Sequence, residues 1–193
     1  MNILKIFCTI LILSFAIASK AQGDETMEKK TSHYAVYLTA GPNYFFNNVV
    51  LGKNLVNEFN YQVTARFMWE PEYFLSLGLE TGYYRLYTAN SSGQGDVHIV
   101  NSAVPLHFLV SMNVWKAYYF DLGVGPSFLQ NKVHSGTYGN FDGSSVSLAD
   151  FSGTLSYRFK WKGHFRMGVG SRFFYSSHVN DKSLALLFIV GYK

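Results

Sequence analysis

The sequence predicts an all-β fold: an eight-stranded antiparallel, up-and-down transmembrane β-barrel that follows a signal peptide. Apolar residues make up 48% of the 193 residues and aromatic residues 18%, but only 15% are charged, against roughly 25% in an average soluble domain. Mean hydropathy is only +0.04, so apolar and small polar residues must alternate finely. Beyond the first 21 residues, no stretch approaches the length of an apolar membrane helix, and a closed barrel is the other structure that spans a bilayer.

Residues 1–21 have the features of a secretory signal peptide. Lys5 supplies positive charge, residues 6–18 are apolar or small, and Ser19-Lys20-Ala21 offers a cleavage site of the small-x-small type. The apolar run would span about 20 Å as a helix, short of the ~30 Å hydrocarbon core, which disfavours a membrane anchor. Residues 22–31 are polar and are expected to form a flexible periplasmic lead-in to the barrel of residues 32–193.

From residue 32 onward, hydrophobicity alternates with a period of two, as it does in strands that separate lipid from a barrel lumen. Phe165 and Met167, for example, alternate with Arg166 and Gly168. The predicted strands are residues 33–41, 58–69, 73–87, 97–115, 117–130, 147–161, 165–176 and 183–193. Short and long connections alternate between them, which places both termini on the periplasmic side with the short turns. The longest connections, residues 42–57 and 131–146, are predicted to be extracellular contact loops.

Aromatic residues cluster around the predicted short turns. The three tryptophans are 46 residues apart, each comes directly before a short turn, and aromatic residues resume after the turn. Indole and phenol rings favour the membrane interface, so this repeat predicts an aromatic girdle at one level. Its predicted members are Trp69, Tyr73, Trp115, Tyr118, Trp161 and Phe165.

The polar face of the predicted strands carries small residues and a few long charged ones. This composition fits the narrow lumen of an eight-stranded barrel, whereas the surface of a soluble calyx would be richer in Lys and Glu. The predicted lumen charge network consists of Arg66, Glu80, Asp121, Arg158, Lys160, Arg166 and Arg172. Counting from the turns predicts two levels, one with Arg66, Arg158 and Asp121 and the other with Glu80 and Arg172. We expect a structural plug, with a narrow ion channel as the alternative.

One segment at the barrel rim could carry chemistry. Ser176, His178 and Asp181 lie at the outer end of the seventh predicted strand, and a His and Ser at this place resemble the lipid A deacylases, a family of eight-stranded outer-membrane enzymes. The serine of that family's motif falls on Asn180 here, so we expect no enzyme and keep a lipid A hydrolase that uses His178 as the alternative. The six histidines show no paired ligand spacing, so no metal and no cofactor is expected.

Short motifs along the chain resemble the bacterial outer-membrane β-barrel domain family that includes PorT-like proteins. They are Val104-Pro105-Leu106, the aromatic-led run from Tyr119 to Pro126, Ala40-Gly41-Pro42-Asn43 and the alternating last strand. The resemblance covers residues 32–193. It implies an outer-membrane location and, for PorT-like members, a role in secretion; it implies no catalytic residues.

These observations together predict a non-enzymatic protein of the bacterial outer membrane. Its expected role is structural or in surface interaction, with lipid and lipopolysaccharide around the barrel and an envelope protein as a partner of the loops. Nothing in the chain forms a basic arm for nucleic acid. We expect a monomer.

Overall fold

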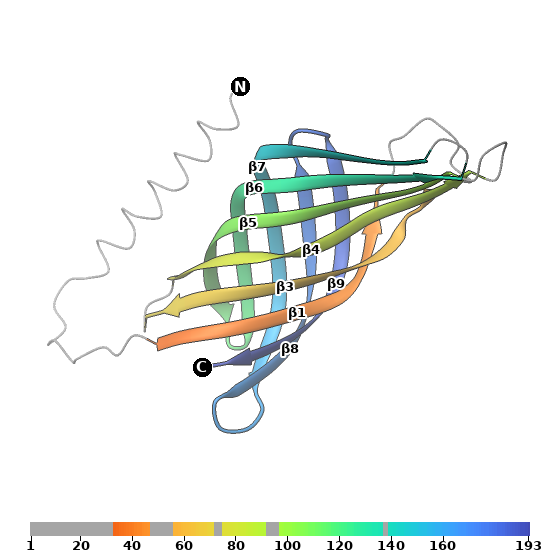
Figure 1. Ribbon diagram of the computed structural model, residues 1–193. Helices are drawn as coiled ribbons and strands as arrows, with labels where there is room; N and C mark the ends of the chain where they lie inside the picture. The colour runs from red at the N-terminus through yellow and green to blue at the C-terminus, as the bar shows by residue number, and fades with distance from the viewer. Residues whose placement is uncertain (1–32, 47–55, 72–74, 92–96, 137–138) are drawn as a thin grey trace, which may run out of the picture. The chain divides into compact units, whose positions relative to one another are not determined.

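Every regular element in the described part of the computed structural model is a strand (Figure 1). The described residues are 33–46, 56–71, 75–91, 97–136 and 139–193. The strands are β1 (His33–Phe45), β2 (Val56–Asn57), β3 (Phe59–Glu70), β4 (Leu75–Ser91), β5 (Val97–Trp115), β6 (Tyr118–Ser135), β7 (Gly139–Lys160), β8 (Phe165–Ser176) and β9 (Asp181–Tyr192). Among these residues no helix has the length and apolar character required to cross a bilayer. The expected signal peptide and lead-in lie outside the described residues.

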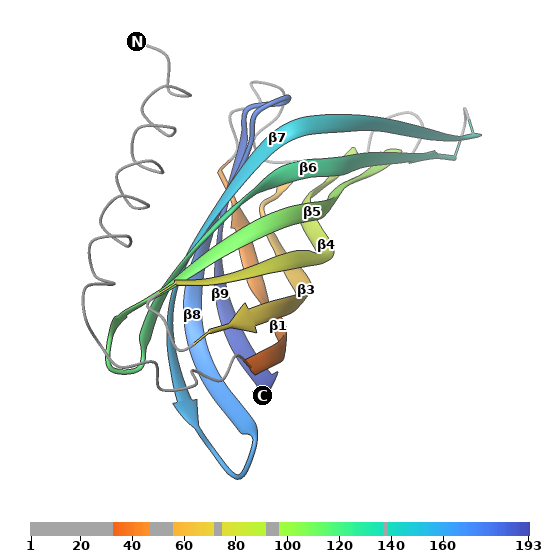
Figure 2. The ribbon, with the colours of Figure 1, turned by 90° about the vertical axis from the view of Figure 1, so that its left-hand side faces the viewer.

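The eight long strands form one closed antiparallel sheet. Each pairs with the next long strand along the chain, and β9 returns to pair with β1, from Val36 opposite Tyr192 to Phe45 opposite Ser183. β2 has only two residues and pairs with Thr88 and Ala89, near the C-terminal end of β4. The strands curve around a common interior (Figure 2). The predicted eight-stranded antiparallel barrel is confirmed.

Alternate side chains enter the lumen or face outward. In β3, Arg66 is 3% exposed while the next residue, Phe67, is 51% exposed, and in β7 buried Thr154 precedes exposed Leu155. Apolar surface costs about 25 cal/mol per Å² when it is left in water. An outer wall of aromatic and aliphatic side chains therefore favours a lipid environment, with the polar residues inside.

The two ends of the barrel are built differently. At one end the connections are short: β5 and β6 join through Lys116 and Ala117, and Lys116 adopts the left-handed conformation with φ of 50°. Lys193 belongs to this end because its amide donates to the carbonyl of His164, at 3.0 Å. His33 lies there too, since β1 runs antiparallel to β9. We call this the short-turn end and the opposite one the projecting end.

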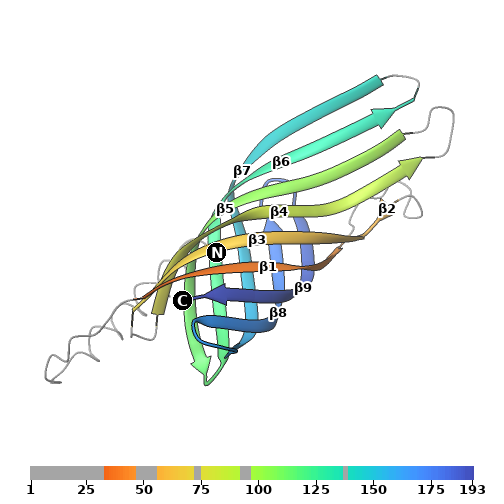
Figure 3. The same ribbon diagram turned by 60° about the horizontal axis from the view of Figure 1, so that its bottom comes forward.

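At the projecting end, strands β4 to β7 continue well past the others (Figure 3). β6 and β7 stay paired up to Ser135 opposite Gly139, whereas β8 reaches β7 only at Phe151. The prediction that residues 131–146 form a loop is therefore wrong, because both of its flanks are paired strands. Of the other predicted loop, residues 42–57, the first four belong to β1 and much of the rest lies outside the described residues. We define the projecting sheet as residues 87–91, 97–103, 129–135 and 139–147.

Candidate functional site

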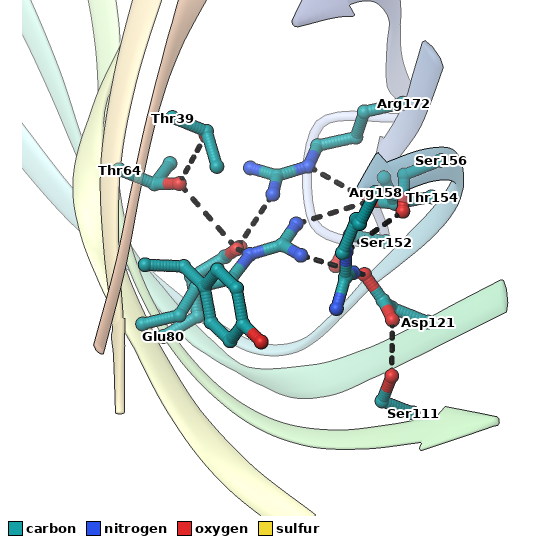
Figure 4. Close-up of polar contacts among 12 residues, drawn as sticks. Thr39, Thr64, Glu80, Ser111, Asp121, Ser152, Thr154, Ser156, Arg158 and Arg172 are labelled. Carbon is teal, nitrogen blue, oxygen red and sulfur yellow. Dashed lines mark hydrogen bonds and ion pairs between the residues drawn. The ribbon is translucent and has the colours of Figure 1, made fainter. Parts of the chain in front are cut away.

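Five strands each place one charged side chain at the centre of the lumen. The residues are Arg66 on β3, Glu80 on β4, Asp121 on β6, Arg158 on β7 and Arg172 on β8, and all are 5% exposed or less. Glu80, Asp121, Arg158 and Arg172 point toward one another across the interior (Figure 4). We call these five residues the lumen network.

Arg66 joins the two carboxylates of the lumen network. Its Nε donates to Glu80 Oε2, and its Nη1 donates to Asp121 Oδ2 at 2.6 Å. Arg172 Nη2 donates to Glu80 Oε2 at 2.6 Å, and Arg158 Nη2 donates to Asp121 Oδ2. Buried charges are tolerated when they are paired and hydrogen-bonded, and here each charged group has such a partner.

Neutral side chains complete the bonding of the lumen network. Tyr84 Oη accepts from Arg172 Nη1 at 2.6 Å and donates to Glu80 Oε1 at 3.0 Å. Ser111 Oγ donates to Asp121 Oδ1 at 2.5 Å. Thr154 Oγ1 accepts from both Arg66 and Arg172, at 3.2 and 3.1 Å.

Both predicted groupings form, Arg66 and Arg158 with Asp121, and Arg172 with Glu80, but they are not separate levels. Arg66 bonds to both expected groups and makes them one network. Arg66 and Glu80 are direct partners in the β3–β4 register, whereas counting from the predicted strand ends Trp69 and Tyr73 places them three and seven residues from the turn. Strands of a barrel tilt and are staggered, so residue counts from a turn do not give height.

Two of the predicted network members lie elsewhere. Lys160 is exposed at the end of β7, and Arg166 belongs to a second cluster at the short-turn end, where its Nη1 is 3.5 Å from Glu70 Oε2. Glu70 also accepts from Tyr37 Oη at 2.6 Å and pairs with Lys193 Nζ at 2.8 Å. The predicted strand ends at Trp69 and leaves Glu70 in the turn, although Glu70 shares the inward parity of Arg66 and is the last residue of β3.

The described members of the predicted girdle face outward at the short-turn end. Trp69, Trp115, Tyr118, Trp161 and Phe165 are all between 40% and 63% exposed, and the rings of Trp115 and Tyr118 stack at a centroid distance of 6.0 Å. Tyr73 lies outside the described residues.

A second boundary marks where the apolar outer wall ends, near the projecting sheet. Val104, Phe128 and Val146 are cross-strand partners there. The row two residues nearer the projecting end consists of Ser102, Gln130 and Ser144. The eleven residue steps from Val104 to Trp115 span about 28 Å at a typical barrel tilt, close to the apolar band of ~25 Å in outer-membrane barrels. The projecting sheet therefore begins where the lipid-facing wall stops.

Between the lumen network and the projecting end, the lumen holds both apolar and polar side chains. The apolar ones form a buried cluster of Phe45, Tyr84, Leu86, Ala103, Leu129 and Phe174. His107 is fully buried, with Nδ1 3.2 Å from Ser152 Oγ and its ring stacked near Phe174. Within the described residues, His107 Nε2 and Asp150 Oδ2 are buried and find no protein partner. The lumen on this side of the network is therefore filled by a mixture of apolar and polar side chains.

The rim residues Ser176, His178 and Asp181 are not assembled as a catalytic group. Ser176 is buried and pairs in register with Asp181, while His178 is exposed in the turn that follows. Within the described part of the chain no hydrogen bond links His178 to either of them. A nucleophile needs a base within hydrogen-bond reach, and the geometry offers no such pair.

The fold and the lumen define the class: a small closed β-barrel with an apolar outer wall and a polar, ion-paired interior, the architecture of bacterial outer-membrane barrels. Solved structures with this fold include Ail, the attachment invasion locus protein of Yersinia pestis, in complex with the heparin analogue sucrose octasulfate. That match has a TM-score of 0.56 and 9% sequence identity, and covers 82% of this chain and 96% of Ail. Neisserial surface protein A matches with a TM-score of 0.47 and 12% identity, over 84% of this chain and 99% of that one.

Sequence comparison adds no closer relative. No protein-family model matches the chain, and no curated protein matches it. The PorT-like resemblance therefore stays a prediction.

Proposed function

We propose that this chain is a non-enzymatic protein of the bacterial outer membrane that contacts an envelope or surface protein through its projecting sheet. One observation carries the proposal: four strands leave the barrel where the lipid-facing wall ends and form an extended sheet. Loops and extensions held on a rigid barrel are where recognition usually resides. With the short turns in the periplasm, as in known barrels, this sheet stands on the cell surface.

The chemistry of the projecting sheet favours a protein partner. Ile99, Val133 and Phe141 are cross-strand partners on the face that also carries buried Leu129, and Phe141 is 59% exposed. Exposed apolar residues grouped on one face are typical of protein interaction sites. A partner that packs on this face would remove them from water.

A sulfated polysaccharide is a weaker candidate. Ail was crystallised with a heparin analogue, and binding of such a polyanion requires clustered positive charge. The described side chains of the projecting sheet include one lysine and one aspartate, Lys132 and Asp142, which are register partners. Their charges offset each other, so we propose a protein contact instead. A PorT-like role beside a secretion apparatus would be a specific form of this proposal.

A plugged lumen is the second part of the proposal. Its support is the lumen network, which ties five strands together across the interior with paired charges. The alternative of a lipid A hydrolase lacks comparable support because His178 has no nucleophile within bonding distance among the described residues.

Site-specific photo-cross-linking in intact cells tests the surface contact. A photoreactive amino acid at position 141 is expected to give a discrete protein adduct, whereas the same group at position 155, on the lipid-facing wall, is expected to give none. Both proteins should fractionate with the outer membrane and keep the heat-modifiable gel mobility of a folded barrel. An absent adduct at position 141, or the same adduct from both positions, would contradict the proposal.

A further inference from the structure

A row of four polar side chains crosses the projecting sheet from one side to the other. Asn90 on β4 is the register partner of His98 on β5, His98 is the partner of His134 on β6, and His134 is the partner of Asn140 on β7. The strands bring the two histidines together although 35 residues separate them in the sequence. Spacing along the sequence does not reveal this pairing, because the two residues are partners only across neighbouring strands.

We propose that His98 and His134 form a two-imidazole binding site for a divalent first-row transition metal, with Cu²⁺ bound most tightly. The two rings lie 6.4 Å apart between centroids, and their planes differ by only 18°. The site belongs to the outer face of the projecting sheet, beyond the last apolar row of the barrel wall. It is distinct from the lumen network and does not depend on the proposed surface contact.

The flanking asparagines set the protonation of both rings. Nδ1 of His98 is hydrogen-bonded to Asn90 Oδ1, and Nδ1 of His134 lies 3.0 Å from Asn140 Oδ1. An amide oxygen accepts hydrogen bonds but cannot donate them, so in both rings Nδ1 carries the proton. Each neutral ring then has its lone pair on Nε2. Metal-binding histidines are characteristically held this way, with the second ring nitrogen donating to an oxygen.

The distance between the rings is compatible with a shared ion. Metal–nitrogen bonds of about 2.0–2.1 Å require the two Nε2 atoms to come within about 4 Å of each other. Rings with centroids 6.4 Å apart meet this condition when they tilt toward each other. The exposure of the site leaves room for that rotation, because His134 is exposed and His98 is only partly covered.

The donor set selects the kind of metal. Imidazole nitrogen favours Cu²⁺, Ni²⁺ and Zn²⁺, and Cu²⁺ forms the most stable complexes in this series. Ca²⁺ and Mg²⁺ prefer oxygen ligands and are not expected to bind. In the described part of the chain, no group of three or more His, Cys, Asp or Glu is placed to hold a metal. The protein thus supplies two ligands, and water completes the coordination.

Metal titration of the mature chain, refolded in detergent without a polyhistidine tag, tests the site. Calorimetry with Cu²⁺ is expected to show one ion per barrel, and electron paramagnetic resonance is expected to show coordination by two nitrogens. His98→Gln and His134→Gln should each weaken binding by about tenfold or more. Asn140→Ala removes only the orienting acceptor and should weaken it by about tenfold, the lower end of such effects.

Matched controls distinguish this site from scattered surface histidines. His164→Gln and His178→Gln remove exposed imidazoles outside the row and should leave the affinity for Cu²⁺ unchanged. Heat-modifiable mobility of every variant confirms that the barrel is folded. Equal affinity of wild type and His134→Gln, or equal losses in the His134 and His164 variants, would overturn the proposal. A strong Ca²⁺ signal at the same stoichiometry would also overturn it.

Discussion

At the scale of single residues, the lumen depends on how each buried charge is compensated. Arg66 is the one member of the lumen network that bonds to both carboxylates, Glu80 and Asp121. Removing one partner of a buried ion pair leaves the other as an uncompensated charge, whereas an exposed pair contributes little. The contribution of each arginine to the free energy of unfolding therefore depends on how deeply it is buried in the lumen.

Arg66→Met is expected to lower the free energy of unfolding by about 3–6 kcal/mol, because it removes two buried hydrogen bonds to carboxylates, each worth about 1.5–3 kcal/mol. Glu80 keeps its bond to Arg172, and Asp121 keeps its bond to Arg158. The matched control is Arg166→Met: the side chain of Arg166 is 25% exposed and 3.5 Å from Glu70, so its loss should cost at most about 1 kcal/mol. Urea unfolding in lipid vesicles, followed by tryptophan fluorescence, measures both. Equal losses would show that the lumen network is hydrated like a surface.

The residues that face the lumen can be predicted from the sequence, but their ion-pair partners across the lumen cannot. The parity of β-strands placed Arg66, Glu80, Asp121, Arg158 and Arg172 on the inward face, and the structure brings these five together. Partners across the lumen depend on strand stagger, which is a property of the closed sheet and leaves no local pattern in the sequence. The pairing of His98 with His134 was hidden for the same reason.

At the scale of elements, the length of β6 and β7 is the main departure from the predicted strands. Residues 131–146 contain several Gly, Ser, Asn and Asp residues, which are typical of turns. In the structure, residues 131–135 of β6 nevertheless pair with residues 139–143 of β7. Strand formation depends on the neighbouring strand more than on local propensity. The barrel strands were predictable because lipid on one side imposes strict alternation, a constraint that ends where the projecting sheet begins.

The seam between β1 and β9 depends on close packing at one glycine. Gly191 faces Tyr37 across the seam, and a Cβ at Gly191 would lie 2.3 Å from the Tyr37 ring. Gly191→Ala is expected to lower the free energy of unfolding by about 1–3 kcal/mol, the usual cost of overpacking. Gly153→Ala is the control, since a Cβ there meets nothing within 4 Å. The same vesicle unfolding assay measures both, and a neutral Gly191→Ala would mean that the Tyr37 ring moves freely.

At the scale of the whole molecule, side chains fill the lumen at its centre and toward the projecting end. The lumen network joins five strands through paired charges. The buried apolar cluster of Phe45, Tyr84, Leu86, Ala103, Leu129 and Phe174 lies between the network and the projecting end. An ion would have to pass this cluster and then separate Arg66 from Glu80 or Asp121.

The purified protein is expected to produce no stepwise conductance in planar bilayers at neutral pH, because passage would require several buried ion pairs to open together. A porin added to the same bilayer serves as the positive control, and heat-modifiable mobility shows that the sample is folded. Reproducible steps in the wild-type protein that disappear when it is heat-denatured would contradict a plugged lumen and favour the narrow channel.

The pairing of β1 with β9 has a consequence for biogenesis. The first strand of the barrel finds its second neighbour only after Asp181–Tyr192 has been synthesised, so the sheet cannot complete its hydrogen bonding before that strand is available. Until then β1 and β8 both present unsatisfied edges, which are templates for aggregation. A premature stop that removed only the last dozen residues would thus leave a nearly complete polypeptide in need of a chaperone.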